Sequence, residues 1–560
     1  MDPVIIVGAG PVGLTLALAL ARQEVPSVVL DEGPGKDEPR LARTVVLRED
    51  TTALVERLTG TPLSEAGAHW AGWRAMRRKQ VMREVTFYDA AEEAEGREGV
   101  SVTNPAPLHI AQHVLTGALR AALADERLVK VAVDSRLDAI EQEASGVTVH
   151  TRGPKGTWWR GSYVVGCDGP RSTVRKLQDI RFPGRTAVER HAVAALHVEL
   201  PWEGQALLHR MPPWRTSGPS GGEVTGRPLP DGVWRLDWLL PPGMDLVTPE
   251  LLVTHVRETL AGWSDGPTPP YELLDTGVHT VHHRLARRWR VGRVFLAGDA
   301  AHCLGTLGTH GLEEGLRDAD NLAWKLASAW HHGPYEALLD SYQTERRAAV
   351  AARLRAADQA LPLLRGGGGL RAYVPGSTRG HDALLIDGHL GQGAIGAPGT
   401  YADSPLAPPQ LEGEVPVDTP RGAPVMDVRV TAEDGSFVRL RDRLGRGALL
   451  VLLIAPGTGV WDRKHWATAG IMPRLAAAVT ALPYPAELLV AESYPGAAAH
   501  SVLLVRPDGH LVTALSGVRP ADLYMAAEAA LGGSVKTTKT TKTTQSAEAA
   551  EEAEAAAGSR

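Results

Sequence analysis

A glycine-rich run near the amino terminus carries the first recognisable chemistry of this chain. Residues 4–13 read VIIVGAGPVG, in which four apolar residues precede glycines at positions 8, 10 and 13. Four apolar residues are typical of a short buried strand. After such a strand, Gly8 suits a tight turn, Gly10 lets backbone approach a phosphate, and Gly13 lets a helix lie close to the strand. The run therefore predicts a strand, a glycine turn and a helix that together hold a diphosphate.

The residues around this run support a dinucleotide ligand. Pro11 and Val12 occupy the predicted first turn of the helix, where the missing N–H of proline has no cost. The free N–H groups and the positive dipole end of that helix favour a diphosphate. Asp31 follows a second apolar run at residues 27–30, and its carboxylate can accept hydrogen bonds from ribose hydroxyls. We expect the adenosine half of a dinucleotide here.

Composition sets limits on the class of protein. The chain has 560 residues, of which 43% are hydrophobic, and a net charge of −6, so we expect about three domains and no nucleic-acid partner. The two cysteines, Cys167 and Cys303, fit a reducing cytoplasm better than a disulfide scaffold. The first strand begins at Val4, and no apolar run is long enough to cross a membrane, so neither a signal peptide nor a membrane span is expected. No cysteine–histidine spacing indicates a metal site.

Two later segments repeat the combination of a buried strand and a carboxylate. Residues 163–175 read YVVGCDGPRSTVR and place Asp168 after an apolar run. Residues 293–302 read RVFLAGDAAH and place Asp299 in the same way. With the amino-terminal run, in this order and spacing, these motifs resemble those of the FAD-dependent aromatic hydroxylases with the para-hydroxybenzoate hydroxylase fold.

The resemblance assigns FAD-binding roles to individual residues. It implies that Asp299 accepts hydrogen bonds from the ribityl hydroxyls, and that Asp168 lies near both FAD and a passing nicotinamide cofactor. It also implies that Arg43 reaches the FAD phosphates and that Gln112, on a helix that follows Leu108, lies near the cofactor. Asp299 is equally able to cap the helix that follows it.

The loop that would hold the flavin ring departs from the family pattern. The resemblance places Gly308, Thr309, His310, Gly311 and Leu312 at the flavin, but the proline pair typical of the family is missing. Two carboxylates, Glu313 and Glu314, fall in the first turn of the next predicted helix, where they would weaken its positive field if they faced the flavin. We expect Glu314 to point to solvent and leave the direction of Glu313 open.

A middle segment suggests the substrate site. Residues 233–240 alternate, with Trp234 and Trp238 on one face of a predicted strand and Arg235 and Asp237 on the other. Aromatic faces suit a flat substrate, and core packing of the same residues is at least as plausible. Three histidines, His191, His197 and His209, are able to deprotonate a phenol, and His197 is assigned to the substrate side. No spacing selects a catalytic base.

The fold expected is α/β: a Rossmann-like FAD-binding domain, an antiparallel-sheet substrate domain and, by resemblance to larger family members, a carboxy-terminal thioredoxin-like α/β domain. Strands are expected at residues 448–454, 487–491 and 501–505, and a region without cysteine cannot exchange disulfides. The expected boundaries are 1–185 with 282–365 (FAD domain), 186–281 (substrate domain), 366–424 (linker), 425–531 (thioredoxin-like domain) and 532–560 (disordered low-complexity tail).

The resemblance implies a monooxygenase that takes electrons from NADPH or NADH. Through a flavin hydroperoxide it would transfer one atom of O2 to an aromatic, polyketide-type substrate. Baeyer–Villiger insertion and a flavin-binding protein that has lost oxygenation are alternatives on the same fold. An NAD(P)-dependent reductase that uses the first motif for nicotinamide is disfavoured by the two later motifs. We expect a cytoplasmic monomer or homodimer.

Overall fold

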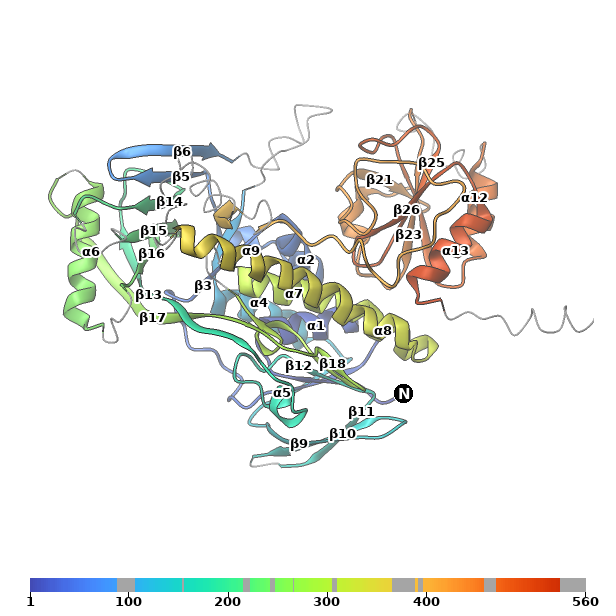
Figure 1. Ribbon diagram of the computed structural model, residues 1–560, viewed down its shortest axis with the longest axis horizontal. Coiled ribbons are helices and arrows are strands. Elements are labelled where there is room, and N and C mark those ends of the chain that lie inside the picture. Colours follow the sequence, from blue (N-terminus) through green and yellow to red (C-terminus); the bar gives the residue numbers. More distant parts are fainter. Residues whose placement is uncertain are drawn as a thin grey trace, which may run out of the picture. The chain divides into compact units, whose positions relative to one another are not determined.

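The computed structural model describes residues 1–87, 106–153, 156–214, 222–241, 247–264, 266–304, 310–364, 388–390, 396–457 and 470–533. These form two compact units (Figure 1). The first comprises Met1–Gly333, Tyr342–Tyr401 and Arg441–Gly447, and the second comprises Pro334–Ser341, Ala402–Leu440 and Ala448–Arg560. Within the part of the chain described, no helix has the length and hydropathy that crossing a bilayer requires.

The first unit contains a six-stranded sheet in the order β18-β19-β12-β1-β2-β8. Its strands are β1 (Val4–Val7), β2 (Ser27–Leu30), β8 (Val129–Ala132), β12 (Tyr163–Gly166), β18 (Arg290–Val291) and β19 (Val294–Leu296). All neighbours are parallel except β18 and β19. The three motifs follow β1, β12 and β19, so they meet at the edge where parallel strands end, which is where open α/β sheets bind ligands.

Three helices pack together beside this sheet. The wholly buried helix α1 (Pro11–Ala21) contacts α4 (Gln112–Ala124) and α7 (His310–His332). The helix predicted to follow Leu108 starts only at Gln112, because Leu108–Ala111 forms strand β7. This strand is buried and pairs with β3 (Thr44–Leu47) and β4 (Ala68–His69), and long-range pairing of this kind leaves no trace in a local helical period.

An eight-stranded sheet forms the second layer of the first unit, in the order β20-β17-β13-β16-β15-β14-β5-β6. The segment 186–281 was expected to form an antiparallel sheet, and it supplies β14 (Gln205–Arg210), β15 (Glu223–Pro228) and β16 (Val233–Leu239), with most of β13 (Gly184–Val198) and β17 (Tyr271–Leu285). Strands β5 (Gly72–Arg77), β6 (Gln80–Thr86) and β20 (His302–Cys303) come from outside that segment, and β5 pairs with β14 in parallel. Helix α6 (Pro249–Trp263) covers one face of this sheet (Figure 1).

Smaller elements complete the first unit. A three-stranded sheet contains β9 (Arg136–Gln142), β10 (Val147–Arg152) and β11 (Trp158–Gly161). The helices α2 (Glu49–Thr59), α5 (Thr173–Leu177) and α9 (Ala348–Leu364) belong to the same unit. A π-helical turn at Gln343–Arg347 leads into α9.

The second unit has a mixed six-stranded sheet in the order β22-β21-β24-β23-β25-β26. The strands are β21 (Arg429–Ala432), β22 (Phe437–Arg439), β23 (Leu449–Ile454), β24 (Ala486–Ala491), β25 (Ser501–Val505) and β26 (Leu511–Ser516), accompanied by helices α12 (Met472–Thr480) and α13 (Pro520–Ala530). The central strand β23 is fully buried, and it runs parallel to β24 and antiparallel to β25. The three strands expected here are therefore present, whereas the predicted tail from residue 534 onward lies outside the described residues.

Candidate functional site

The glycine turn after β1 has the geometry that a diphosphate requires. Gly8 has a φ of +108°, and a Cβ on Gly13 would lie 2.0 Å from the Gly8 carbonyl oxygen, so neither position has room for a side chain. A Cβ on Gly10, by contrast, would meet nothing within 4 Å. Gly10 is thus the one of the three whose missing side chain leaves open space, at the start of the buried helix α1. The turn fits the diphosphate of FAD.

Asp31 is fixed against this turn. Its Oδ2 atom accepts the N–H of Ala9 at 2.6 Å, and its Oδ1 atom accepts the N–H of Gly33 at 2.8 Å. A carboxylate has further lone pairs, so these two bonds orient Asp31 and leave it able to accept from ribose hydroxyls.

Arg43 and Gln112, which were predicted to lie near the cofactor, contact each other. The Arg43 Nε–H donates to Gln112 Oε1 at 2.9 Å, and the Gln112 backbone N–H donates to the Arg43 carbonyl at 2.9 Å. The pair joins the segment before β3 to the start of α4, and the Arg43 side chain remains exposed.

The Gly298–Asp299 turn packs directly onto the glycine turn. A Cβ on Gly298 would lie 3.1 Å from the Val12 side chain, and a Cβ on Gly315 would lie 2.6 Å from it, so the start of α7 approaches both turns closely. Asp299 is open to solvent but recessed. Desolvation by the surrounding protein raises the pKa of its carboxyl, against the attraction of His302 and Arg43. A recessed acceptor suits the proposed contact with ribityl hydroxyls.

Asp318 holds this turn in place, although the sequence motif gave it no role. Its Oδ2 atom accepts the Gly298 N–H at 2.9 Å and lies 2.8 Å from His302 Nε2, while its Oδ1 atom accepts Arg346 Nε–H at 2.8 Å. Three converging donors on one wholly buried carboxylate make Asp318 a positioning residue for Asp299.

Asp168 and the two cysteines have structural surroundings. Asp168 Oδ2 accepts the N–H groups of Thr173 and Val174 at 2.6 and 3.0 Å, which caps the short helix α5, and burial raises its pKa. Burial also raises the pKa of the Cys167 thiol and that of Cys303, the latter to about 12. Cys303 is therefore a buried thiol with little of the reactive thiolate form.

The expectation that Glu314 points to solvent is wrong. Its side chain is 1% exposed and forms ion pairs with Arg317 at 2.6 Å and with Arg346 and Arg353 at 2.7 Å. Although burial opposes ionisation, these arginines hold the Glu314 pKa well below its usual range. A local pattern does not reveal such pairing, because Arg346 and Arg353 come from a later part of the chain.

Glu313 is also buried and paired. Its Oε1 atom accepts the Arg48 backbone N–H at 2.8 Å, its other oxygen contacts the Arg48 guanidinium, and Thr51 lies 3.1 Å away. Both carboxylates at the start of α7 are thus neutralised by arginine, so they do not remove the positive field of that helix.

The predicted aromatic lining is part of the core. Trp234 and Trp238 lie with Leu236 in a buried cluster beneath α6, and the Trp238 indole donates to Thr259 at 2.9 Å. They do not line a cleft, because α6 covers their face of the sheet. The opposite face carries Arg235, whose Nε–H donates to the Ala42 carbonyl, one residue before Arg43.

A polar cluster occupies this second face, which we call the polar face. His191 Nδ1 lies 2.6 Å from Asp237 Oδ1, and the His191 ring stacks on that of His279, with centroids 4.9 Å apart and planes 6° apart. Arg235 approaches the same carboxylate to 3.0 Å and Arg227 to 3.9 Å. Strand register brings the cluster together, since His191 pairs with His279 and Val193 with Asp237.

The two stacked histidines have opposite protonation tendencies. Burial disfavours the charged form of His191, but Asp237 and Glu189 outweigh it and raise the His191 pKa to about 9. Burial together with the positive charges of His191, Arg235 and Arg227 lowers the His279 pKa to about 4. At neutral pH one ring is cationic and the other neutral.

The other histidines are placed differently. His209 is buried, with Nε2 2.6 Å from the Arg78 carbonyl and Nδ1 accepting from Trp263, which is a structural arrangement. His197, predicted to face substrate, is exposed six residues beyond His191 on β13, next to Gly232. Sequence spacing did not distinguish His191 from these two, and it gave no signal for His279 or Arg227.

A divalent cation is a less suitable occupant of the polar face. The ligand atoms of His191, Asp237 and His279 lie within 4.8 Å of one another, a spacing that a metal ion can bridge. However, Arg235 and Arg227 approach the same carboxylate, and a buried positive charge repels a cation.

The predicted flavin loop lies partly outside the described residues. Gly308, Thr309 and the side chain of His310 lie outside the described residues. Gly311 and Leu312 are partly exposed in the first turn of α7, and a Cβ on Gly311 would lie 2.7 Å from the Leu304 carbonyl oxygen.

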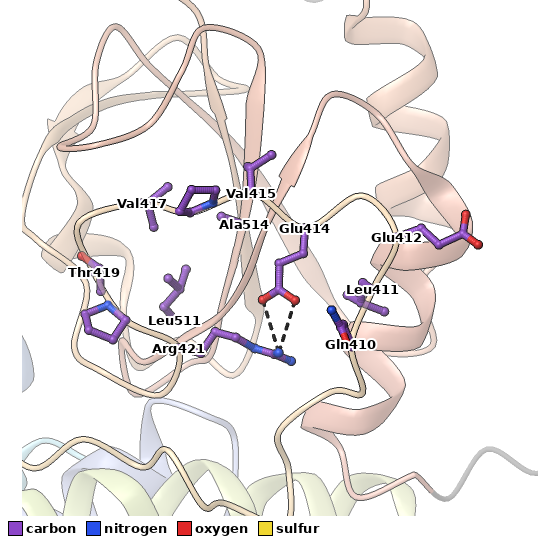
Figure 2. Close-up of a pocket in the computed structure, with 12 residues that line it drawn as sticks. Gln410, Leu411, Glu412, Glu414, Val415, Val417, Thr419, Arg421, Leu511 and Ala514 are labelled. Carbon is purple, nitrogen blue, oxygen red and sulfur yellow. Dashed lines mark hydrogen bonds and ion pairs between the residues drawn. The ribbon is translucent and has the colours of Figure 1, made fainter.

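A pocket of about 700 Å³ lies in the second unit (Figure 2). Its wall carries the Glu414–Arg421 ion pair at 3.2 Å, beside apolar residues such as Val417 and Leu511. It contains none of the residues predicted to bind cofactor or substrate, so we place the chemistry at the sheet edge of the first unit.

Comparisons with known proteins identify the family of the chain. The family model described as "FAD binding domain" matches residues 1–357. Two curated relatives are 3-(3-hydroxy-phenyl)propionate/3-hydroxycinnamic acid hydroxylases. The protein of Mycolicibacterium smegmatis is 31% identical over 61% of this chain and 58% of its own length. The protein of Paraburkholderia xenovorans is 31% identical over 62% of this chain and 53% of its own. The chain thus spans less than two thirds of these relatives.

Solved structures show the same fold over more of the chain. The flavin-dependent monooxygenase PieE, solved with FAD and substrate, has a TM-score of 0.71 at 20% identity and covers 94% of this chain and 98% of its own. Aklavinone-11 hydroxylase, solved with FAD and aklavinone, has a TM-score of 0.69 at 22% identity, with coverages of 95% and 99%.

Proposed function

The chain belongs to the FAD-binding-domain family, and from this premise we propose that it is a flavoprotein monooxygenase that hydroxylates a phenolic substrate. One observation carries the proposal. The glycine turn, the Gly298–Asp299 turn and the start of α7 converge at one edge of the parallel sheet, which also has open space at Gly10. The open turn fits the diphosphate, and the recessed Asp299 fits the ribityl chain.

The protein's own contribution is positioning and electrostatics. FAD, when bound, takes electrons from NADPH or NADH and activates O2 for transfer of one oxygen atom. Asp31, Arg43 and Asp299 would hold and orient the cofactor. The start of α7 would keep its positive field, because arginines neutralise Glu313 and Glu314. This neutralisation weakens the alternative of a flavin protein that has lost oxygenation.

The substrate class follows from the relatives and the polar face. Curated relatives are named for hydroxyphenylpropionate, and two structural neighbours are a flavin-dependent monooxygenase and an aklavinone hydroxylase. An ionisable aromatic hydroxyl is common to hydroxyphenylpropionate and to polyketide-type phenols, and a polar face with several cations suits it. We also propose that the second unit is thioredoxin-like, which the β23–β24–β25 arrangement supports.

The visible spectrum during anaerobic addition of NADPH tests this function. We expect purified protein to be yellow, and its flavin to bleach faster when 3-(3-hydroxyphenyl)propionate or aklavinone is present. Oxygen should then restore the oxidised spectrum and yield hydroxylated product. Bound FAD that stays oxidised with every phenol would contradict the proposal, and so would a protein that binds no FAD.

A further inference from the structure

The polar face holds an arrangement that the family motifs do not assign. His279 lies on β17 with an exposed side chain, and its ring stacks on His191, which is 14% exposed and bonded to Asp237. Behind this stack, the Arg235 guanidinium is buried and donates through Nε to Ala42 and through Nη2 to Asp237. Its Nη1 atom is buried with no hydrogen-bond partner, as is the Thr225 hydroxyl on the same face.

A buried polar atom without a hydrogen-bond partner is costly, and a water molecule or a group of a bound ligand can satisfy it. An unpaired guanidinium N–H calls for an acceptor, and a negatively charged acceptor most of all. The exposed His279 ring offers an acceptor and a route for a proton to water. The polar face therefore combines a site for an anion with a site for the proton that is released when that anion forms.

We propose that His279 accepts the proton of the substrate's aromatic hydroxyl, and that Arg235 and the His191–Asp237 pair stabilise the phenolate that remains. The inference rests on the proposed function. In this step the phenol O–H bond breaks, its electron pair stays on the oxygen, and an N–H bond forms on the His279 ring. The proton then passes to solvent, so no oxidant or reductant takes part. His279 is the catalytic residue, and His191 is a positioning residue.

The charges around His279 make this transfer feasible. A phenol ionises with a pKa of about 10, and one nearby cation lowers such a value by about 1–3 units. The cationic His191 and Arg235 would act together on a hydroxyl bound at this face. Burial and the same cations lower the pKa of His279, so at neutral pH the ring is in the neutral form that can accept a proton, and it holds that proton only transiently before releasing it to water.

The charged and titratable groups that face His279 come from four strands and from the segment before β3. They are Glu189 and His191 on β13, Glu223 and Arg227 on β15, Arg235 and Asp237 on β16, Asp275 on β17 and Arg40. Cations and carboxylates among these groups are equal in number. The direction in which they shift the His279 pKa therefore depends on which of them lie nearest to the ring. The groups nearest His279 are the stacked His191 and the Asp237 carboxylate.

The test measures the ionisation of a bound phenol in the oxidised holoenzyme, without turnover. The probes are 4-nitrophenol, 3-(3-hydroxyphenyl)propionate and aklavinone, and the one that perturbs the flavin spectrum of the wild type at the lowest concentration is used. We expect its phenolate absorbance at a pH at least one unit below that needed in free solution. His191→Gln should shift the ionisation back by one unit or more, because it removes a cation. His279→Gln should leave the ionisation of the bound probe near that of the wild type, and at pH 7 it should lower kcat at least tenfold with little change in KM.

The pH profile separates a proton acceptor from a structural residue. In His279→Gln, kcat should recover as pH approaches the pKa of the free phenol. In His191→Gln, the acid limb of the wild-type profile should move from about pH 4 toward the ordinary histidine pKa, because the neighbouring cation is gone. The control is His150→Gln, a histidine that lies 3.4 Å from Asp138 in a different sheet, and it should match the wild type.

Two results would overturn the inference alone: His279→Gln with the kcat and pH profile of the wild type, or His191→Gln that ionises the bound probe exactly like the wild type. If the wild type binds none of the probes and none accelerates bleaching, the proposed function itself has failed. Should His279→Gln not fold, the NMR titration of His279 in the wild type replaces it. Its pKa should rise by at least one unit when the phenol binds, and a constant value would refute the transfer.

Discussion

At the scale of single residues, the three glycines of the first motif have different structural roles. Gly13 is required by the fold, since a Cβ there would lie 2.0 Å from a backbone oxygen, whereas Gly10 has open space around it. The sequence motif alone does not distinguish these glycines. The structure separates a glycine that positions a helix from a glycine that admits a ligand.

This difference gives a test by substitution. Gly10→Ala should leave the stability of the FAD-free protein within about 0.5 kcal/mol of the wild type, because nothing clashes, and should weaken FAD binding at least tenfold. Gly13→Ala should lower stability by about 1–3 kcal/mol, because α1 must move away from β1. Urea denaturation of FAD-free protein and titration with FAD measure both effects.

The matched control is Gly117→Ala, which adds a methyl group to an exposed position of α4 with nothing within 4 Å. This substitution should not change FAD affinity. Its only expected effect on stability is a gain of about 1 kcal/mol from the higher helix propensity of alanine. If Gly10→Ala binds FAD as tightly as the control, the diphosphate does not lie at this turn.

Glu314 supports a second prediction at this scale. Glu314→Gln removes one charge from a buried group of ion pairs and leaves arginines uncompensated, which costs about 3–5 kcal/mol at neutral pH. The exposed Glu65→Gln should cost less than about 0.5 kcal/mol. Denaturation by urea at pH 7 measures both, and equal stabilities would contradict the buried ion pairs.

The pH dependence of the Glu314 effect has a definite sign. Because the folded pKa lies below the ordinary value, the charged form contributes stability above pH of about 4.3 and loses it as pH falls further. The difference between wild type and Glu314→Gln should therefore shrink below about pH 4.

At the scale of elements, strand register assembles the polar face. His191 raises stability only while it is protonated, because its pKa in the folded state, about 9, exceeds the ordinary value of about 6.5. This contribution, of the order of 3 kcal/mol, is present below pH 6.5 and is lost as pH rises through 9. Wild type and His191→Gln should thus converge in unfolding free energy between pH 6.5 and 9. A constant difference would show that Asp237 does not hold the imidazolium.

Elements also show what the sequence was able to predict. The first strand, glycine turn and helix were recognisable, because their pattern is local and their spacing is strict. The contribution of β5 and β6 to the second sheet was not, since β5 pairs with a strand more than 120 residues away. The same reason explains which site residues were predicted. Arg43 and Gln112 were found through a resemblance. His279 and the arginines that pair with Glu314 were not found, because their positions depend on strand register and on distant helices.

The aromatic strand β16 illustrates the remaining ambiguity. Alternation correctly divided Trp234 and Trp238 from Arg235 and Asp237, but it did not say which face lies under a helix. That choice depends on α6, whose position no pattern within β16 records.

At the scale of the whole molecule, both cysteines lie in the first unit, so their reactivity reports on that unit alone. Raised pKa values suppress the reactive thiolates. We expect a thiol reagent at pH 8 to label native protein far more slowly than a free cysteine peptide, and to label both thiols once the first unit unfolds.

Added FAD should raise the temperature at which labelling begins, because a ligand that binds only the folded unit stabilises it by mass action. Calorimetry on the same samples identifies the transition concerned. Labelling that is insensitive to FAD would show that the thiols become exposed without loss of the cofactor site.

The order of strands in the first sheet has a consequence for biosynthesis. The strand β1 leaves the ribosome long before its sheet is complete, because β12 pairs with β19 at Val294–Leu296, and α1 packs on α7, which ends at His332. At about 5–20 residues per second, about 15–60 s of translation separate the glycine turn from the helix that completes its surroundings. During that interval the apolar residues of β1 and α1 lack their final partners. We therefore expect FAD to bind late in synthesis, once α7 has emerged from the ribosome.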